Sequence, residues 1–256
     1  MNLNLDNKII IVTGGAKGIG EGIVKALAAE NAIPVIVGRK EADNLKTLES
    51  INNKGFHVVA ELTEPQQCEM AIKQIAAKYN RIDGLVNNAG LNDGVGLEKG
   101  NYEEFVASLH RSLVHYYLMA HHALPFLKLS QGAIVNIGSK TAETGQGNTS
   151  GYAAANGGRN ALTREWAVEL LKYKIRVNSI VVSECWTPQY ANWIKKEPGA
   201  EEKLKHIKEK IPLENRMTTP EEIADMVIFL LSERSSHTTG QLIHVDGGYV
   251  HLDRAI

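Results

Sequence analysis

Seven short runs of hydrophobic residues recur along the chain, each bounded by polar residues or glycine. They are KIIIVT (8–13), PVIVG (34–38), HVVA (57–60), GLVN (84–87), AIVNI (133–137), IRVNSIVV (175–182) and QLIHV (241–245). Runs of this kind are typical of strands buried on both faces of a parallel sheet. Helical periodicity occupies the intervals at 19–31, 41–53, 65–79, 102–129, 151–172 and 220–232. The alternation predicts a doubly wound α/β fold with a seven-stranded parallel sheet and helices on both faces.

One interval, residues 183–219, breaks this rhythm and separates the sixth strand from the next helix. It holds two tryptophans and three prolines, namely Trp186, Pro188, Trp193, Pro198 and Pro212. Insertions near the carboxyl end of a strand often form lids or substrate walls. Because no repeat or linker divides the chain, we expect one domain over residues 1–256, with a substrate-covering insertion at about 183–219.

Composition and charge narrow the class of ligand. Hydrophobic residues make up 43% and charged residues 22%, as in ordinary globular proteins. The formal net charge of −1 lacks the basic surplus that nucleic acid or an anionic membrane attracts, so a small-molecule ligand fits better. The two cysteines, Cys68 and Cys185, form no CxxC pattern, and we expect no metal site. Without a signal sequence or a long apolar segment, the chain is expected to be cytoplasmic.

A glycine-rich stretch, TGGAKGIG at 13–20, follows the first strand directly and opens the first helix. In that context Gly14 permits a tight turn, Gly18 lets the backbone approach a pyrophosphate, and Gly20 allows close packing of helix and sheet. The amides and dipole at the start of the helix favour the phosphate charge. The stretch therefore predicts a dinucleotide-binding loop.

Combined with NNAG at 87–90 and a serine 13 residues before a tyrosine, this loop resembles the short-chain dehydrogenase/reductase family. The resemblance covers the entire chain. It implies a Rossmann-like fold, an NAD(P)-dependent oxidoreductase activity, a nicotinamide cofactor and a homotetramer.

The same resemblance implies which residues contact the cofactor. NAD-binding members carry an acidic residue after the second strand, where this chain has Gly38 followed by Arg39. Arginine can bind a 2′-phosphate through charged donors, and Lys17 adds a second cation, so NADP is favoured while NAD stays possible. The other implied cofactor-binding residues are Gly14, Gly18, Ile19, Gly20, Glu61, Leu62, Asn88, Ala89, Gly90, Tyr152, Asn156 and Thr187.

Two catalytic positions match the family and two depart from it. The resemblance implies that Ser139 holds the reacting oxygen and Tyr152 exchanges the proton. The family's lysine is Asn156 here, expected to keep the ribose hydrogen bond, and the family's asparagine is Ser112. A free phenol has a pKa of about 10. Without the positive charge of the family's lysine, the ionised Tyr152 needs another source of stabilisation. Arg159, near the same helical stripe, is one candidate, although a surface or interface arginine is the commoner interpretation.

Several longer stretches resemble a narrower group, L-fucose dehydrogenase and related aldose dehydrogenases, which oxidise a sugar at the anomeric carbon. These stretches are NNAGLNDGVGLE, SLHRSLVHYYLMAHHALP, SKTAETGQGNTSGY, LTREWAVEL and SSHTTGQLIHVDGGYVHLDRA. A polyol needs directional polar groups and often an aromatic platform, for which Gln146, Glu184 and Trp186 are the predicted residues. Two alternatives stay open: a 3-oxoacyl or other carbonyl reductase, and a catalytically weak nucleotide-binding protein.

Overall fold

The fold is built on a seven-stranded sheet in which all strands run parallel. A computed structural model describes residues 2–252. The strands are β1 (Ile9–Thr13), β2 (Ile33–Gly38), β3 (Phe56–Val59), β4 (Gly84–Asn87), β5 (Ala133–Ser139), β6 (Arg176–Val182) and β7 (Leu242–Val245). Their order is β3-β2-β1-β4-β5-β6-β7, which confirms the predicted doubly wound, Rossmann-like sheet.

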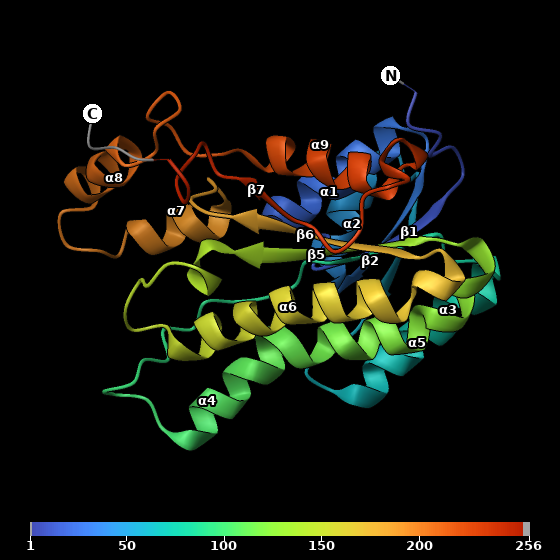
Figure 1. Cartoon of the computed structure of the whole chain (residues 1–256), viewed down its shortest axis with the longest axis horizontal. Coiled ribbons are helices and arrows are strands. Elements are labelled where there is room, and N and C mark those ends of the chain that lie inside the picture. Colours follow the sequence, from blue (N-terminus) through green and yellow to red (C-terminus); the bar gives the residue numbers. More distant parts are fainter. Residues whose placement is uncertain (1, 253–256) are drawn as a thin grey trace.

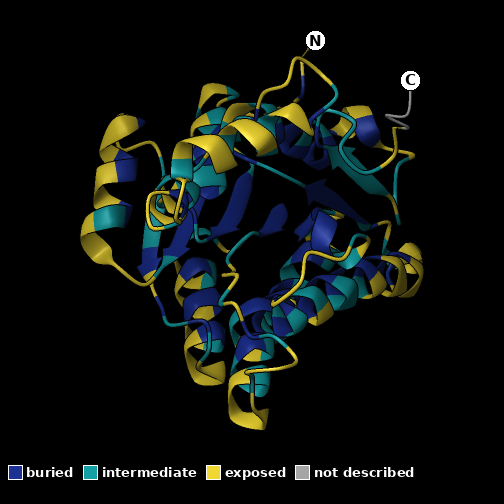
Figure 2. Ribbon diagram, turned by 90° about the vertical axis from the view of Figure 1, so that its left-hand side faces the viewer, coloured by how far each residue is buried: buried dark blue, intermediate teal, exposed yellow. Residues whose placement is uncertain are grey.

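Helices cover both faces of the sheet (Figure 1). They are α1 (Gly18–Ala29), α2 (Glu41–Ser50), α3 (Pro65–Tyr79), α4 (Tyr102–Leu109), α5 (His115–Ser130), α6 (Ser150–Glu169), α7 (Pro188–Ile194), α8 (Ala200–Glu209) and α9 (Pro220–Leu231). One hydrophobic core lies between the sheet and α1, α2 and α9, and a second between the sheet and α3, α5 and α6. Figure 2 shows the buried strands between these layers, with exposed residues on the outer sides of the helices.

The carboxyl ends of the central strands meet at one edge of the sheet. β1 pairs with β2 on one side and with β4 on the other, so the chain changes direction of winding there. Such a switch point opens a crevice in which open α/β sheets bind ligands. The glycine-rich loop after β1, the NNAG stretch after β4 and Ser139 at the end of β5 all lie at this edge.

Two predicted segments differ in detail from the structure. The segment 102–129 is not one regular helix, because a π-helical turn at His110–Val114 separates α4 from α5. Residues 183–219 contain the short helices α7 and α8, and Figure 1 places them at the carboxyl ends of β5 and β6. No helix within residues 2–252 combines the length and the apolar character needed to span a bilayer.

Candidate active site

The glycine-rich loop is shaped by close contacts that a side chain would disturb. Gly14 has a φ of +63°, in the left-handed region that favours glycine. A Cβ on Gly20 would overlap the carbonyl oxygen of Gly14 and lie 2.6 Å from Asn88 Nδ2. Within the described residues, no side chain caps the first turn of α1, so its amides face the loop. This cradle fits a phosphate group.

The NNAG stretch and Thr187 border the same loop, as the family resemblance implies. The Asn88 side chain donates to the Thr13 carbonyl oxygen at 2.9 Å, and the amides of Asn88 and Ala89 donate to Thr13 Oγ1 at 2.9 and 3.1 Å. Thr187 lies beside Gly18, 3.3 Å from the position that a Cβ there would take. Ile19 packs against the core beneath the loop.

Each predicted phosphate-binding cation is paired with a carboxylate. Arg39 Nη1 lies 3.4 Å from Glu61 Oε2, and Lys17 Nζ lies 2.7 Å from Asp43 Oδ2. Both cations are more than half exposed, so these pairs are weak and can open for a ligand. Partial burial acts to raise the pKa of Glu61, but hydrogen bonds from Thr63 and the Arg39 charge lower it. The next residue, Leu62, is buried.

Ser139 and Tyr152 come from adjoining elements. Ser139 is the last residue of β5, and its Oγ accepts hydrogen bonds from the amide and the hydroxyl of Thr141 at 3.3 and 3.2 Å. Tyr152 lies in the first turn of α6, which packs against the short helix Lys140–Ala142 that follows Ser139. The 13-residue spacing between Ser139 and Tyr152 thus connects the end of β5 to the first turn of α6.

Asn156 is fully buried one turn below Tyr152, and its carboxamide is engaged at both ends. Its Nδ2 donates to the Tyr152 carbonyl oxygen at 2.8 Å, and its Oδ1 accepts from Arg159 Nη1 at 3.0 Å. The predicted ribose contact of Asn156 would have to compete with these bonds, and it stays a prediction.

Arg159 corrects an expectation, because the surface or interface interpretation is wrong. The residue is 2% exposed, and its guanidinium points into the protein under Tyr116 and Tyr152. The helical spacing placed it on the stripe of Asn156, but only the packing of α6 against β5 and α5 decides that this stripe faces inward.

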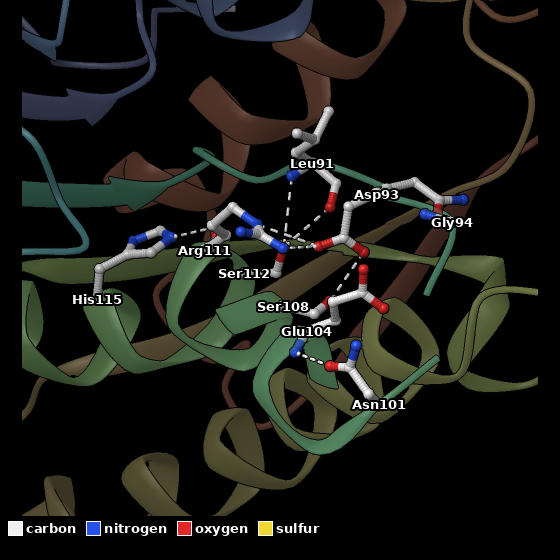
Figure 3. Close-up of polar contacts among 10 residues, drawn as sticks. Leu91, Asp93, Gly94, Asn101, Glu104, Ser108, Arg111, Ser112 and His115 are labelled. Atoms are coloured by element: carbon white, nitrogen blue, oxygen red, sulfur yellow. Dashed lines mark hydrogen bonds and ion pairs between the residues drawn. The ribbon is translucent and has the colours of Figure 1, made fainter. Parts of the chain in front are cut away.

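Ser112 lies in the π-helical turn and links three segments. Its Oγ donates to the Leu91 carbonyl oxygen at 3.2 Å, while its own carbonyl oxygen accepts from Arg159 Nε at 2.7 Å. A π turn shifts the backbone hydrogen-bond register, which explains how this mid-helix carbonyl reaches a side chain. Figure 3 shows the neighbouring pair of Asp93 with Arg111, joined at 2.6 Å, which tethers the loop after NNAG to this turn.

A second polar cluster lies where β5 and β6 end side by side. Glu184, just past β6, forms a short ion pair with Lys140, the residue after Ser139, and both side chains are largely buried. Lys140 Nζ also lies 4.1 Å from the centre of the Tyr249 ring. Within residues 2–252, the Tyr190 hydroxyl on α7 has no well-aligned hydrogen bond and is buried close to Glu184. Burial, the Glu184 charge and the contact with this carboxylate raise the pKa of Tyr190.

The three predicted substrate residues differ in how close they lie to this cluster. Glu184 is part of it, and Trp186 is 43% exposed with its ring centre 6.1 Å from that of Tyr190. Gln146 lies in an exposed loop apart from these contacts. Lys140 and Tyr190 were missed by sequence reasoning. The position of Lys140 next to Ser139 was the one available signal.

Comparisons with known proteins agree with this geometry. A family model described as enoyl-(acyl carrier protein) reductase, of the short-chain dehydrogenase/reductase type, matches residues 14–250. The chain is 33% identical to 3-oxoacyl-[acyl-carrier-protein] reductase FabG of Thermotoga maritima, covering 97% of the chain and 100% of that protein. It is 30% identical to L-fucose dehydrogenase of Bos taurus, over 97% of the chain and 91% of that protein.

Two solved structures are also similar. The crystal structure of Cj0485 dehydrogenase superposes with a TM-score of 0.95 at 44% identity, covering 100% of this chain and 99% of the other. Ligand-free aldohexose dehydrogenase of Thermoplasma acidophilum gives 0.90 at 27% identity, with the same shares covered. Matches that span the glycine loop, NNAG and the Ser139–Tyr152 pair establish that the chain belongs to the short-chain dehydrogenase/reductase family of oxidoreductases.

Proposed function

We propose that the protein is an NADP-preferring dehydrogenase that oxidises an L-fucose-like aldose at its anomeric carbon. The observation that carries the proposal is the polar cluster beside Ser139, in which Lys140, Glu184 and the buried Tyr190 hydroxyl lie next to the half-exposed Trp186. Several directional polar groups beside an aromatic ring suit a sugar better than an alkyl chain. The similarity to L-fucose and aldohexose dehydrogenases points the same way.

In this proposal the chain's residues divide the work between proton transfer and positioning. When bound, the nicotinamide cofactor of the family would supply the hydride acceptor for the anomeric carbon. Ser139 Oγ donates a hydrogen bond to the reacting sugar oxygen, and the Tyr152 oxygen accepts the proton from the anomeric hydroxyl. The C–H and O–H bonds break, a C=O bond forms, and the product is the lactone. Gly14, Gly18 and Gly20 would hold the cofactor phosphates.

A carbonyl reductase acting on a 3-oxoacyl substrate is the second candidate, favoured by the 33% identity to FabG. The buried ion pair beside Ser139 argues against it, since charged groups are costly next to an apolar chain. An aldose panel with NADP and with NAD, followed by cofactor absorbance between pH 7 and pH 10, tests the proposal. L-Fucose and its stereochemical relatives should be oxidised fastest. Turnover of 3-oxoacyl thioesters alone, or cofactor binding without any turnover, would each contradict it.

Removing the Tyr190 hydroxyl separates a ligand contact from a structural one. Because this hydroxyl has no well-aligned hydrogen bond within the described residues, Tyr190→Phe should leave the melting temperature unchanged or slightly higher. If the hydroxyl instead binds the sugar, KM for the aldose should rise about 5-fold, since a lost hydrogen bond is worth about 1 kcal/mol. Steady-state kinetics and thermal unfolding of the same variant decide between these roles. An unchanged KM would remove Tyr190 from the substrate site.

Cofactor preference should depend on Arg39 and much less on surface charge elsewhere. Arg39→Ala is expected to raise KM for NADP about 10- to 100-fold and to leave KM for NAD nearly unchanged, because hydrogen bonds to charged groups contribute about 1.5–3 kcal/mol. Lys73→Ala is a matched control, since Lys73 forms a similar exposed pair with Glu69 on α3. Equal effects on NADP and NAD would contradict recognition of the 2′-phosphate.

A further inference from the structure

Two cations are buried beside the active site, and they differ in whether a carboxylate neutralises their charge. Lys140 and Arg159 are 7% and 2% exposed, and they are the buried lysine and arginine of the described chain. The charge of Lys140 is neutralised by Glu184. Arg159 pairs with no carboxylate within residues 2–252, so its positive charge is left uncompensated inside the protein. A buried charge without a partner is costly, which makes it a candidate for function.

The contacts of Arg159 hold its guanidinium in place without cancelling the charge. Nε donates to the Ser112 carbonyl oxygen at 2.7 Å, and Nη1 donates to the Ile137 carbonyl oxygen at 2.9 Å and to Asn156 Oδ1 at 3.0 Å. All three acceptors are neutral. Within residues 2–252, Nη2 is buried without an acceptor and lies beside Gly90, 2.7 Å from where a Cβ would stand. The charge is thus fixed between α6, the π turn and the NNAG stretch.

Several ionisable groups surround Arg159, and they differ in whether they can ionise in response to its charge. The guanidinium carbon lies 4.3 Å from the centre of the Tyr116 ring and 5.9 Å from that of Tyr152. Burial raises the pKa of Tyr116, so this phenol stays protonated. Burial and the Arg159 charge lower the pKa of His115 to about 3, so this imidazole stays neutral.

The remaining charged groups near the site are paired. Asp93 is bonded to Arg111, Glu61 to Arg39, and Glu184 to Lys140. Tyr152 is partly exposed. Of the ionisable groups facing Arg159, it is therefore the one that is not fully buried.

We propose that Arg159 is a positioning residue whose buried charge stabilises the ionised form of the Tyr152 phenol. Asn156 and the Ser112 carbonyl hold the guanidinium in place by accepting its hydrogen bonds. The inference rests on the proposed role of Tyr152 in proton transfer. A unit charge about 6 to 9 Å from an ionising group, at an effective dielectric constant of about 20, shifts its ionisation by about 1 to 2 pH units. Since the cation favours the anionic phenolate, removing the cation must move the ionisation to higher pH.

The test compares Arg159→Met, Arg159→Lys and Asn156→Asp with wild type. Arg159→Met removes the charge at similar length. Asn156→Asp is nearly isosteric and places a carboxylate on Nη1, which neutralises the guanidinium without emptying its site. Arg164→Met is the control, because Arg164 is exposed on the same helix. The first readout is the tyrosinate absorbance of the cofactor-free protein against pH, with the matching Tyr152→Phe protein subtracted. The second is the pH profile of kcat.

Arg159→Met and Asn156→Asp should each move the Tyr152 ionisation and the rise of kcat upward by about 1 to 2 pH units. Arg159→Lys and Arg164→Met should stay within a few tenths of a unit of wild type. Unchanged profiles in a folded Arg159→Met or Asn156→Asp protein would overturn the proposal. If Arg159→Met fails to fold, Asn156→Asp alone decides. Because the absorbance titration uses no substrate, a shift there combined with no aldose turnover would reject the proposed function and keep this inference.

Discussion

Replacing Tyr152 by phenylalanine is expected to lower kcat roughly a thousandfold, within the 10²–10⁴-fold range that a positioned acid–base group contributes. Cofactor affinity should fall much less than kcat, because the phosphate loop is built from other residues. The fold should also survive. Within the described chain, the side-chain hydrogen bond to Tyr152 runs from Asn156 Nδ2 to the Tyr152 backbone carbonyl oxygen, and the substitution keeps it. Steady-state kinetics measures kcat, and a fluorescence titration measures cofactor affinity.

Tyr117→Phe serves as the control for this substitution, since Tyr117 is 51% exposed on α5 and lies outside the site. It should retain wild-type activity. A Tyr152→Phe enzyme that keeps more than about a tenth of the wild-type kcat would contradict the acid–base assignment. A wild-type protein that binds the cofactor but turns over no substrate would instead favour the nucleotide-binding alternative.

The second large effect is expected at Gly20, where an added methyl group should strongly weaken cofactor binding. In Gly20→Ala the new Cβ would overlap the Gly14 carbonyl oxygen and press on the Asn88 side-chain nitrogen, and both groups shape the loop that would cradle the phosphates. Overpacking of this kind costs about 1–3 kcal/mol, so cofactor affinity should fall by up to roughly a hundredfold. Titration of protein fluorescence with NADPH measures the loss.

Gly157→Ala is the matched control, because Gly157 lies inside α6 with no heavy atom within 4 Å of the position of its Cβ. There the substitution should raise the free energy of unfolding by up to about 1 kcal/mol through helix propensity, without changing cofactor affinity. If Gly20→Ala binds NADPH as tightly as wild type, the loop after β1 is not the phosphate site.

Local patterns in the chain were sufficient to predict the fold and the frame of the site. The seven apolar runs correspond to β1 through β7 within one or two residues, since a strand buried on both faces leaves a continuous apolar signal. The glycine loop was also recognisable, because it follows directly on a strand. NNAG and Ser139 were predicted from the family resemblance, and the structure has them at the carboxyl ends of β4 and β5. Short-range spacing further placed Tyr152, Asn156 and Arg159 along one helix.

The tertiary structure alone decided how the charges of the site are distributed. Helical spacing places Arg159 near Asn156, but it cannot tell whether that face meets solvent or β5 and α5. The π turn that presents the Ser112 carbonyl has no periodic signature in a segment that reads as one helix. The pairs Lys140–Glu184 and Arg39–Glu61 join residues 44 and 22 positions apart. Patterning within single elements determined what this chain folds into, because each strand and helix carries its own signal. Long-range packing determined which buried cation has no carboxylate partner within residues 2–252, because burial and pairing depend on neighbours that are distant in sequence.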